Sequence, residues 1–272
     1  MRGIIAYFKK SFLTAIQYKF NIFMACITPL IALGLFYTVS QTFIGNGGNI
    51  IVTMDNYSIS YFKYAISGII LSYYPFKVLS SFCQEMENAK QVGQLEMLLV
   101  SSTSFGKIIG AMFTWKLIFS LMITLPCLIF GAYYIKEYYV FTASQVLLIS
   151  LVLFLSLMVF FCFVLCVAGF ILIFDRVVYF VGLCIQGLRI LGDIFIPIYF
   201  LPKPLKLIAA GLPLQLYLNP LRGIIFNHYS LINIAPYLCK LLIFIIIMGP
   251  ISIIFFRFCL KKAMTDGILG RY

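Results

Sequence analysis

Residues 147–174 read LLISLVLFLSLMVFFCFVLCVAGFILIF, a run of apolar side chains with no charge among them. A helix needs about 20 apolar residues to cross the hydrocarbon core of a bilayer, so this run predicts a membrane-spanning helix. Residues 241–258, LLIFIIIMGPISIIFFRF, repeat the pattern with Arg257 as the one charged side chain. These two runs place the chain among the α-helical integral membrane proteins.

The composition supports the same class. Of the 272 residues, 63% are hydrophobic and only 10% are charged, and a water-soluble domain of this size could not bury so much apolar surface. The net charge is +12, but the basic residues are scattered and flank the apolar runs, which indicates contact with lipid rather than with nucleic acid. Most of the eight cysteines lie inside apolar runs and the chain has one histidine, so no metal site is expected.

Six apolar runs are long enough to be counted as spans. They cover residues 21–43, 61–83, 108–134, 143–173, 177–200 and 232–258. Residues 1–20 predict an amphipathic helix at the membrane interface, with apolar residues at helical spacing; the alternative is an extension of the first span. We therefore expect one all-α transmembrane domain over residues 1–272, with six membrane-spanning helices.

Charge near the two ends of the chain sets the expected orientation. Basic residues flank the first and last spans, and an even number of spans puts both termini on one side, so both termini are expected in the cytoplasm. The protein is then a multi-pass protein of the cell membrane. Lys77 and Lys116 lie within spans, close enough to the cytoplasmic end to extend toward water, and no function is predicted for them.

Residues 84–107, QEMENAKQVGQLEMLLVSSTSFGK, form an island of charge between the second and third spans. Three of the eight acidic residues lie here, and a bilayer does not accommodate such a cluster without partners. The island is therefore expected in cytoplasmic water. Its leucines give it an apolar face, which is typical of a docking surface for another protein. Glu85 and Glu87 suit a helix N-terminus, where carboxylates meet the positive end of the helix dipole.

Two motifs carry a family resemblance. Residues 93–101, GQLEMLLVS, resemble the G-T-L-E-x-L-L-x-S-P pattern of type-2 ABC exporter permeases, with Gln94 in place of the Thr and Ser102 in place of the Pro. A second match, IPIYFLP at 196–202 followed by LPL at 212–214 and NPLR at 219–222, resembles that family's F-P-x-x-x-L-P … N-P-L … R region. The chain itself contains no phosphate-binding G-x-x-x-x-G-K-[ST] loop.

The resemblance implies that transport and ATP hydrolysis are carried out by different subunits. In this family the loop after the second span carries a short coupling helix that docks on a separate ATPase, and two permeases and two ATPases form the exporter. The permease is then no enzyme and holds no cofactor, because ATP and magnesium bind to the partner. The second permease can be an identical or a homologous chain. The residues on or beside the docking element would be Glu85, Glu87, Lys90, Gly93, Leu95, Glu96 and Leu98.

The segment at 193–231 resembles the family's pair of short re-entrant helices on the outer side. Five prolines between 197 and 220 exclude one straight helix there. An apolar outer gate is predicted from Phe195, Pro197, Ile198, Tyr199 and Phe200. The alternative is plain packing of a loop against the outer ends of the spans.

The fifth span carries three polar side chains, Gln186, Arg189 and Asp193, spaced to lie on one helical face. An arginine near the middle of a bilayer needs a partner, and Asp193, one turn away, is the expected one. The stripe would face a dimer interface or the transport path; alternatively it is an ion pair that fixes helix packing inside one subunit.

The substrate class stays open at this point. The family resemblance implies export of an amphipathic molecule such as a drug, an antibiotic, a lipid or a lipid-linked glycan. A polysaccharide or teichoic-acid exporter with a continuous channel is the alternative, and an aromatic ladder along the first and fifth spans would favour it. Less expected are an ATP-independent transporter and a lipid-modifying enzyme, for which no clustered acid, base or metal site is found.

Overall fold

A computed structural model describes residues 2–45, 51–54, 57–95, 97, 105–135, 142–174, 177–195, 197–198 and 201–265. This part of the chain is built almost entirely from helices, which confirms the all-α class. The helices are α1 (Arg2–Gln17), α2 (Lys19–Gly45), α3 (Tyr61–Gln91), α5 (Phe105–Ile135), α6 (Ala143–Ile173), α7 (Val177–Leu191), α8 (Lys203–Ala210), α9 (Pro213–Asn227) and α10 (Leu231–Thr265).

Four of the described helices are long and apolar enough to cross a membrane. They are the segments Lys63–Gln91, Phe105–Gly131, Ala143–Ile173 and Leu231–Thr265. The helices α2 and α7 contribute shorter apolar segments, Ile22–Leu35 and Val177–Leu191. The prediction of several helices long and apolar enough to span a membrane is therefore confirmed, and the six-span layout stays a prediction.

A two-stranded hairpin departs from the all-α expectation. Strands β1 (Ile51–Met54) and β2 (Tyr57–Ser60) pair antiparallel, with Ile51 opposite Ser60 and Met54 opposite Tyr57. Their sequences, IVTM and YSIS, are rich in the β-branched and aromatic residues that favour extended backbone. The hairpin joins α2 to α3.

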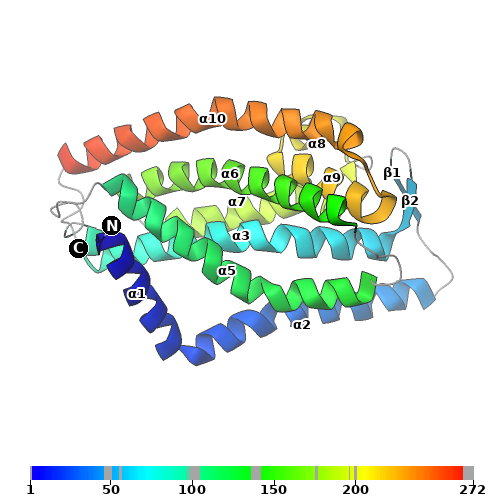
Figure 1. The fold of residues 1–272 in the computed structure, drawn as a ribbon, viewed down its shortest axis with the longest axis horizontal. Helices are drawn as coiled ribbons and strands as arrows, with labels where there is room; N and C mark the ends of the chain where they lie inside the picture. Colours follow the sequence, from blue (N-terminus) through cyan, green and yellow to red (C-terminus); the bar gives the residue numbers. More distant parts are fainter. Residues whose placement is uncertain are drawn as a thin grey trace.

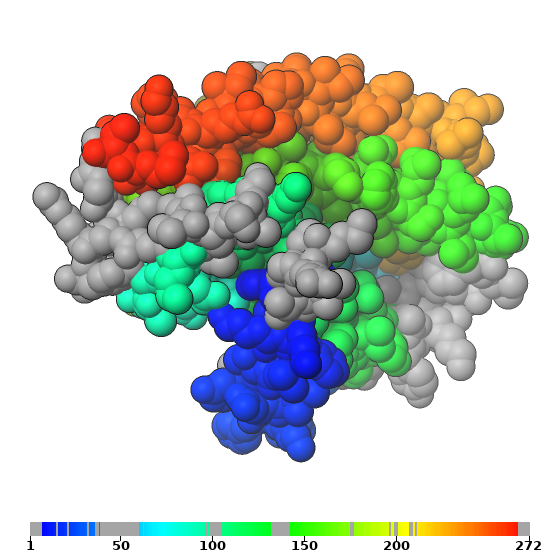
Figure 2. Space-filling view, turned by 60° about the vertical axis from the view of Figure 1, so that its left-hand side comes forward, coloured from blue at the N-terminus to red at the C-terminus, as the bar shows by residue number. Residues whose placement is uncertain are grey.

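The helices form an elongated bundle with two distinct ends (Figure 1). The island end holds α1, the last turns of α3, the first turns of α5 and the end of α10. The hairpin end holds β1, β2, α8 and α9. Helix α3 lies between α5 and α6, and α10 packs along α6. The helix α1 and the beginning of α2 protrude from the body of the bundle (Figure 2).

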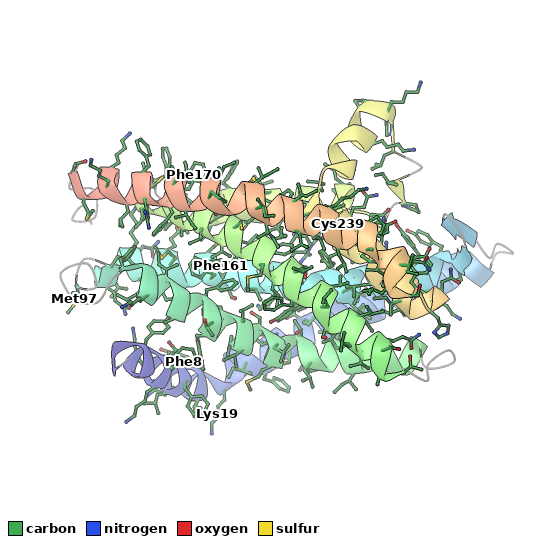
Figure 3. All side chains as sticks on the ribbon, turned by 45° about the horizontal axis from the view of Figure 1, so that its top comes forward. Phe8, Lys19, Met97, Phe161, Phe170 and Cys239 are labelled. Carbon is green, nitrogen blue, oxygen red and sulfur yellow. The ribbon has the colours of Figure 1, made fainter. Side chains whose placement is uncertain are left out.

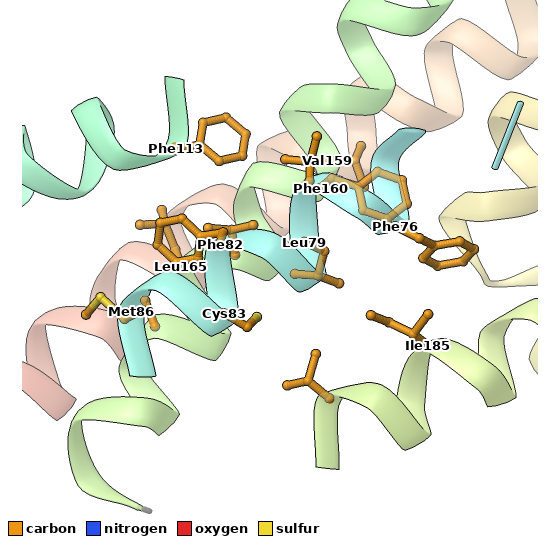
Figure 4. Packing of buried hydrophobic residues seen from close by; sticks show 14 of the residues in the cluster. Phe76, Leu79, Phe82, Cys83, Met86, Phe113, Val159, Phe160, Leu165 and Ile185 are labelled. Atoms are coloured by element: carbon orange, nitrogen blue, oxygen red, sulfur yellow. The ribbon is translucent and has the colours of Figure 1, made fainter. Parts of the chain in front are cut away.

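The core is centred on α3. Its apolar side chains Phe76, Phe82 and Met86 are almost fully buried and lie against α5, α6 and α7 (Figure 4). Phe76 meets Phe160 of α6 edge to face, with ring centroids 6.1 Å apart. In contrast, α10 buries only a narrow stripe on α6 and leaves a broad isoleucine-rich face exposed, as expected of a helix that contacts lipid.

The fifth predicted span is wrong at its end. The helix was expected to run to residue 200, but α7 stops at Leu191. Asp193 then adopts a left-handed backbone with φ of 66°, which a continuing helix cannot contain. The segment that follows is not a continuation of the span but leads into the two short helices α8 and α9.

Candidate functional site

The charged island begins as part of α3. This helix continues through Glu85, Glu87 and Lys90 to Gln91, and Gly93 ends it with a φ of 70°, donating its N–H to the Lys90 carbonyl at 3.0 Å. Only glycine adopts that backbone at little cost. The predicted helix N-terminus at Glu85 and Glu87 is therefore wrong, because both lie in the last turns of a long helix.

Glu87 does meet a helix N-terminus, although not that of its own helix. Its Oε2 atom accepts a hydrogen bond from the backbone N–H of Val178 at 3.0 Å, in the first turn of α7. The first N–H groups of a helix have no partner within the helix and carry the positive end of its dipole. The carboxylate thus satisfies a donor of α7 and is 8% exposed.

Lys90, one turn further along α3, caps the neighbouring helix. Its Nζ atom donates to the carbonyl of Ile171 at 2.9 Å and to that of Phe174 at 3.1 Å, at the C-terminus of α6. A cation at this negative end complements the dipole. Glu87 and Lys90 together hold the end of α6 and the start of α7 against one turn of α3, so these two residues have intramolecular partners.

Polar side chains connect helix α1 to the end of α3 and to α5. Glu85 accepts a hydrogen bond from the Tyr7 hydroxyl at 3.1 Å and pairs with Lys116 of α5 at 3.1 Å. Burial, and then the charge of Glu85, raise the pKa of the Tyr7 hydroxyl, which therefore stays protonated and donates. Lys10 donates to the Gln94 side chain at 2.9 Å, which joins α1 directly to the island.

The island presents exposed apolar side chains at the tip of the bundle. Val92 is 81% exposed and Met97 is 76% exposed; Met97 lies at the extreme island end, away from the helices (Figure 3). Leu95 instead is buried. Two further predicted docking residues, Glu96 and Leu98, lie outside the described residues. Among the described residues of the island, the exposed apolar side chains therefore lie at its tip, whereas Glu87 and Lys90 before it are buried.

A second polar cluster lies at the hairpin end, where Arg222 of α9 is fully buried. Its Nη1 atom pairs with Asp193 Oδ2 at 3.2 Å and donates to the Asp193 carbonyl at 2.8 Å. The guanidinium carbon lies 3.9 Å from the centre of the Tyr64 ring. The predicted ion pair between Arg189 and Asp193 is therefore wrong, because Asp193 lies past the end of α7 and is paired with Arg222.

The second oxygen of the Asp193 carboxylate accepts two further hydrogen bonds. Its Oδ1 atom accepts from the Tyr64 hydroxyl at 2.7 Å and from the Ile198 N–H at 2.9 Å. Gly68 of α3 makes room for the cluster: a Cβ there would contact the Arg222 guanidinium and lie 2.7 Å from the Ile194 carbonyl. Asp193 and Arg222 thus lock α3, α9 and the turn after α7 together.

Arg189 lies apart from this cluster. Its guanidinium is 5.6 Å from the centre of the Phe76 ring and lines a cavity with Phe195. Gln186 is exposed, so the three residues of the predicted stripe have three different environments. Of the predicted outer gate, Phe195 lines the Arg189 cavity, Pro197 and Ile198 are buried, and Tyr199 and Phe200 lie outside the described residues.

Several residues of these clusters carry no recognisable signal in the sequence. Tyr64, Ser67 and Gly68 contribute to the Arg222 site from α3, but in the sequence they look like ordinary members of an apolar run. Two features of the sequence single out Arg222: it ends the NPLR motif, and it is a charged residue among apolar ones. Among the described residues, no group of three or more His, Cys, Asp or Glu side chains is arranged to hold a metal ion.

Neither a protein-family model nor a curated protein matches this chain. The resemblance to exporter permeases therefore rests on the motifs alone and stays a prediction.

Proposed function

We propose that this chain is the membrane-spanning permease subunit of an ATP-driven ABC exporter, and that it moves an amphipathic substrate out of the cytoplasm or the inner leaflet. Two copies of an ATPase subunit would dock at the island end, and a second permease would complete the assembly. The observation that carries the proposal is the apolar tip at Val92 and Met97, on a segment whose sequence resembles a coupling helix.

The contacts around this tip support a role in transmitting force. Lys10 and Gln94 connect the island to α1, and Glu87 and Lys90 connect the end of α3 to α7 and α6. A partner that pushes on the tip would therefore act on four helices at once. ATP hydrolysis in the partner would supply the energy, and rearrangement of the bundle would open the path.

Among the substrate alternatives, a continuous channel for a glycan receives no support from the described side chains of α7. The exposed aromatic residues of that helix are Tyr179 and Phe180, both in its first turn, so they form no ladder along its length. Helix α2, which contains the first predicted span, does expose Phe20 and Phe23 near its beginning, so our preference for an amphipathic substrate rests on the side chains of α7.

Co-purification from the native host tests the proposal. The tagged chain is extracted in mild detergent, and the eluate is assayed for ATP hydrolysis and, by mass spectrometry, for a nucleotide-binding subunit. Met97→Lys places a charge in the apolar tip and is expected to lower the bound ATPase about tenfold, as loss of an interface anchor does. Because Met97 is exposed, the fold should tolerate the change.

Met264→Lys is the matched control, since Met264 is another exposed methionine, at the C-terminal end of α10. It should leave the ATPase bound. An unaltered chain that brings down no ATPase, or a Met97→Lys variant that retains as much as the control, contradicts the proposal.

A further inference from the structure

Two cavities follow one another in the groove between α2, α3 and α5. The first, near the island end, encloses about 390 Å³, and its lining includes Lys77, Ser81 and Glu85 of α3, Trp115 and Lys116 of α5, and Lys10 of α1. The second encloses about 210 Å³ and is lined mainly by apolar side chains, among them Pro29, Leu33 and Cys127, together with Tyr73 and Arg189.

The lining residues place the two cavities one after the other along the same helices. Along α2 the lining passes from residues 22 and 25 to residues 29 and 33, and along α5 it passes from 119 and 123 to 127. Helix α3 runs in the opposite direction. Followed from the island end, its lining therefore passes from Lys77 to Tyr73, which lie one turn apart, a rise of about 6 Å. A ligand could therefore contact both cavities.

The groove carries more positive than negative charge. The first cavity has three lysines and one glutamate, and that glutamate is already paired with Lys116. Within the part of the chain that the structure describes, no carboxylate pairs with Lys77 or with Arg189, and the Arg189 guanidinium lies 5.6 Å from the centre of the Phe76 ring. Arg189 lines a mainly apolar cavity, and a cation in an apolar setting is costly without a counter-charge, which points to a ligand that supplies one.

The complementary ligand is an amphiphile with an anionic head. An arginine guanidinium matches the oxygens of phosphate or carboxylate with two parallel hydrogen bonds, and a lysine adds a second point charge. Apolar walls at Leu33 and Cys127 suit a hydrocarbon tail. A cationic amphiphile would meet repulsion at Lys77 and Arg189, and a zwitterionic head would bring a second charge of the wrong sign.

We propose that this groove binds an amphiphile with a phosphate or carboxylate head, with Lys77 and Arg189 as successive contacts for the head. The proposal names the substrate class of the exporter and in that sense rests on the proposed function, but the binding step itself needs no ATPase. It also assigns a role to Lys77, for which the sequence predicted none.

Trp115 provides the measurement, because it lines the first cavity and is the only tryptophan of the chain. The purified chain in mild detergent is titrated with short-chain phosphatidic acid, and with phosphatidylcholine of the same chain length, while tryptophan fluorescence is recorded. The dissociation constant for phosphatidic acid should be about tenfold lower than that for phosphatidylcholine, as expected for one charge-assisted contact. Equal affinities would overturn the proposal.

Substitutions then test the two cations. Arg189→Gln and Lys77→Gln should each weaken phosphatidic acid binding about tenfold, and Arg189→Lys should restore part of the loss because it keeps the charge. Arg257→Gln, on the exposed side of α10, is the matched control and should bind as the unaltered chain does. If Arg189→Gln binds like this control, or if Arg189→Lys binds no better than Arg189→Gln, the assignment fails.

Two further comparisons distinguish binding of an amphiphile from binding of phosphate alone, and failure of the groove assignment from failure of the proposed function. If inorganic phosphate displaces the lipid at equal concentration, the site recognises phosphate alone and the amphiphile is overturned as its ligand. If the chain brings down no ATPase yet binds phosphatidic acid through Arg189, the proposed function fails and the groove assignment stands. If the chain brings down an ATPase but Arg189→Gln does not weaken phosphatidic acid binding, the proposed function stands and the assignment of the groove as its binding site fails.

Discussion

The buried pair of Asp193 and Arg222 allows a sharp prediction about stability. In an Asp193→Asn variant, one carboxylate oxygen becomes an amide NH₂ group. Around Asp193, the Arg222 Nη1 atom, the Tyr64 hydroxyl and the Ile198 N–H all donate hydrogen bonds. Whichever way the new amide turns, its NH₂ group therefore faces at least one donor, and the guanidinium loses its counter-charge.

The expected loss in the free energy of unfolding is about 3–5 kcal/mol, the usual effect of removing one partner from a buried ion pair. Neutral hydrogen bonds between membrane helices contribute much less, about 0.6 kcal/mol on average. The higher figure is appropriate because Arg222 is fully buried and its guanidinium carries a full charge. Backbone strain should add nothing to the measured loss of stability, because asparagine tolerates the left-handed conformation at φ of 66°.

The assay is unfolding of the purified chain by addition of SDS to mild detergent micelles, followed by circular dichroism. Arg222→Met and the double variant complete a mutant cycle. The double variant should be less destabilised than the sum of the single variants by at least about 1.5 kcal/mol, because both charges leave together. A loss below about 1 kcal/mol for Asp193→Asn, within the range of neutral bonds, or additive single effects, would refute the ion pair as a stabilising contact.

Three other perturbations are tested in the same detergent system. Gly68→Ala should lower the free energy of unfolding by about 1–3 kcal/mol, because the new methyl group has no room. Gly110→Ala is the control, because the space around Gly110 is open, and it should be neutral or stabilising. Equal effects of the two substitutions would show that Gly68 is not crowded. Lys90→Met should cost about 2 kcal/mol through the loss of two bonds to carbonyl groups, and unchanged SDS unfolding would show that water replaces them. Phe8→Ala should shift the fluorescence of Trp115 to the red, because the two rings meet edge to face at 5.8 Å, and an unshifted spectrum would mean that α1 does not cover Trp115.

The long helices were predictable because each follows from a local pattern. Apolar runs of sufficient length predicted α5, α6 and α10 close to their observed bounds. The amphipathic spacing of residues 1–20 predicted α1 as a helix in its own right. Such elements need no information from distant parts of the chain.

The end of α7 was not predictable from its own sequence. The apolar run continues past Leu191, and the spacing of Arg189 and Asp193 suits a pair within one helix. What ends the helix is a partner 29 residues further along, since Arg222 holds both the carbonyl and the carboxylate of Asp193. Likewise, Glu87 and Lys90 find their partners 81 to 91 residues away, at helix ends that no local motif connects to the island.

Helix α3 connects the polar features of the described chain. Its island end carries Glu87 and Lys90, its middle carries Lys77 in the groove, and its hairpin end carries Tyr64 in the Arg222 cluster. On the proposed function, a displacement of the island must reach the groove before it reaches the locked hairpin end. Pro75 lies between Lys77 and that locked end, and a proline inside a helix removes one backbone hydrogen bond. The helix can therefore bend at Pro75, so that Lys77 moves with the island while Tyr64 stays with Arg222.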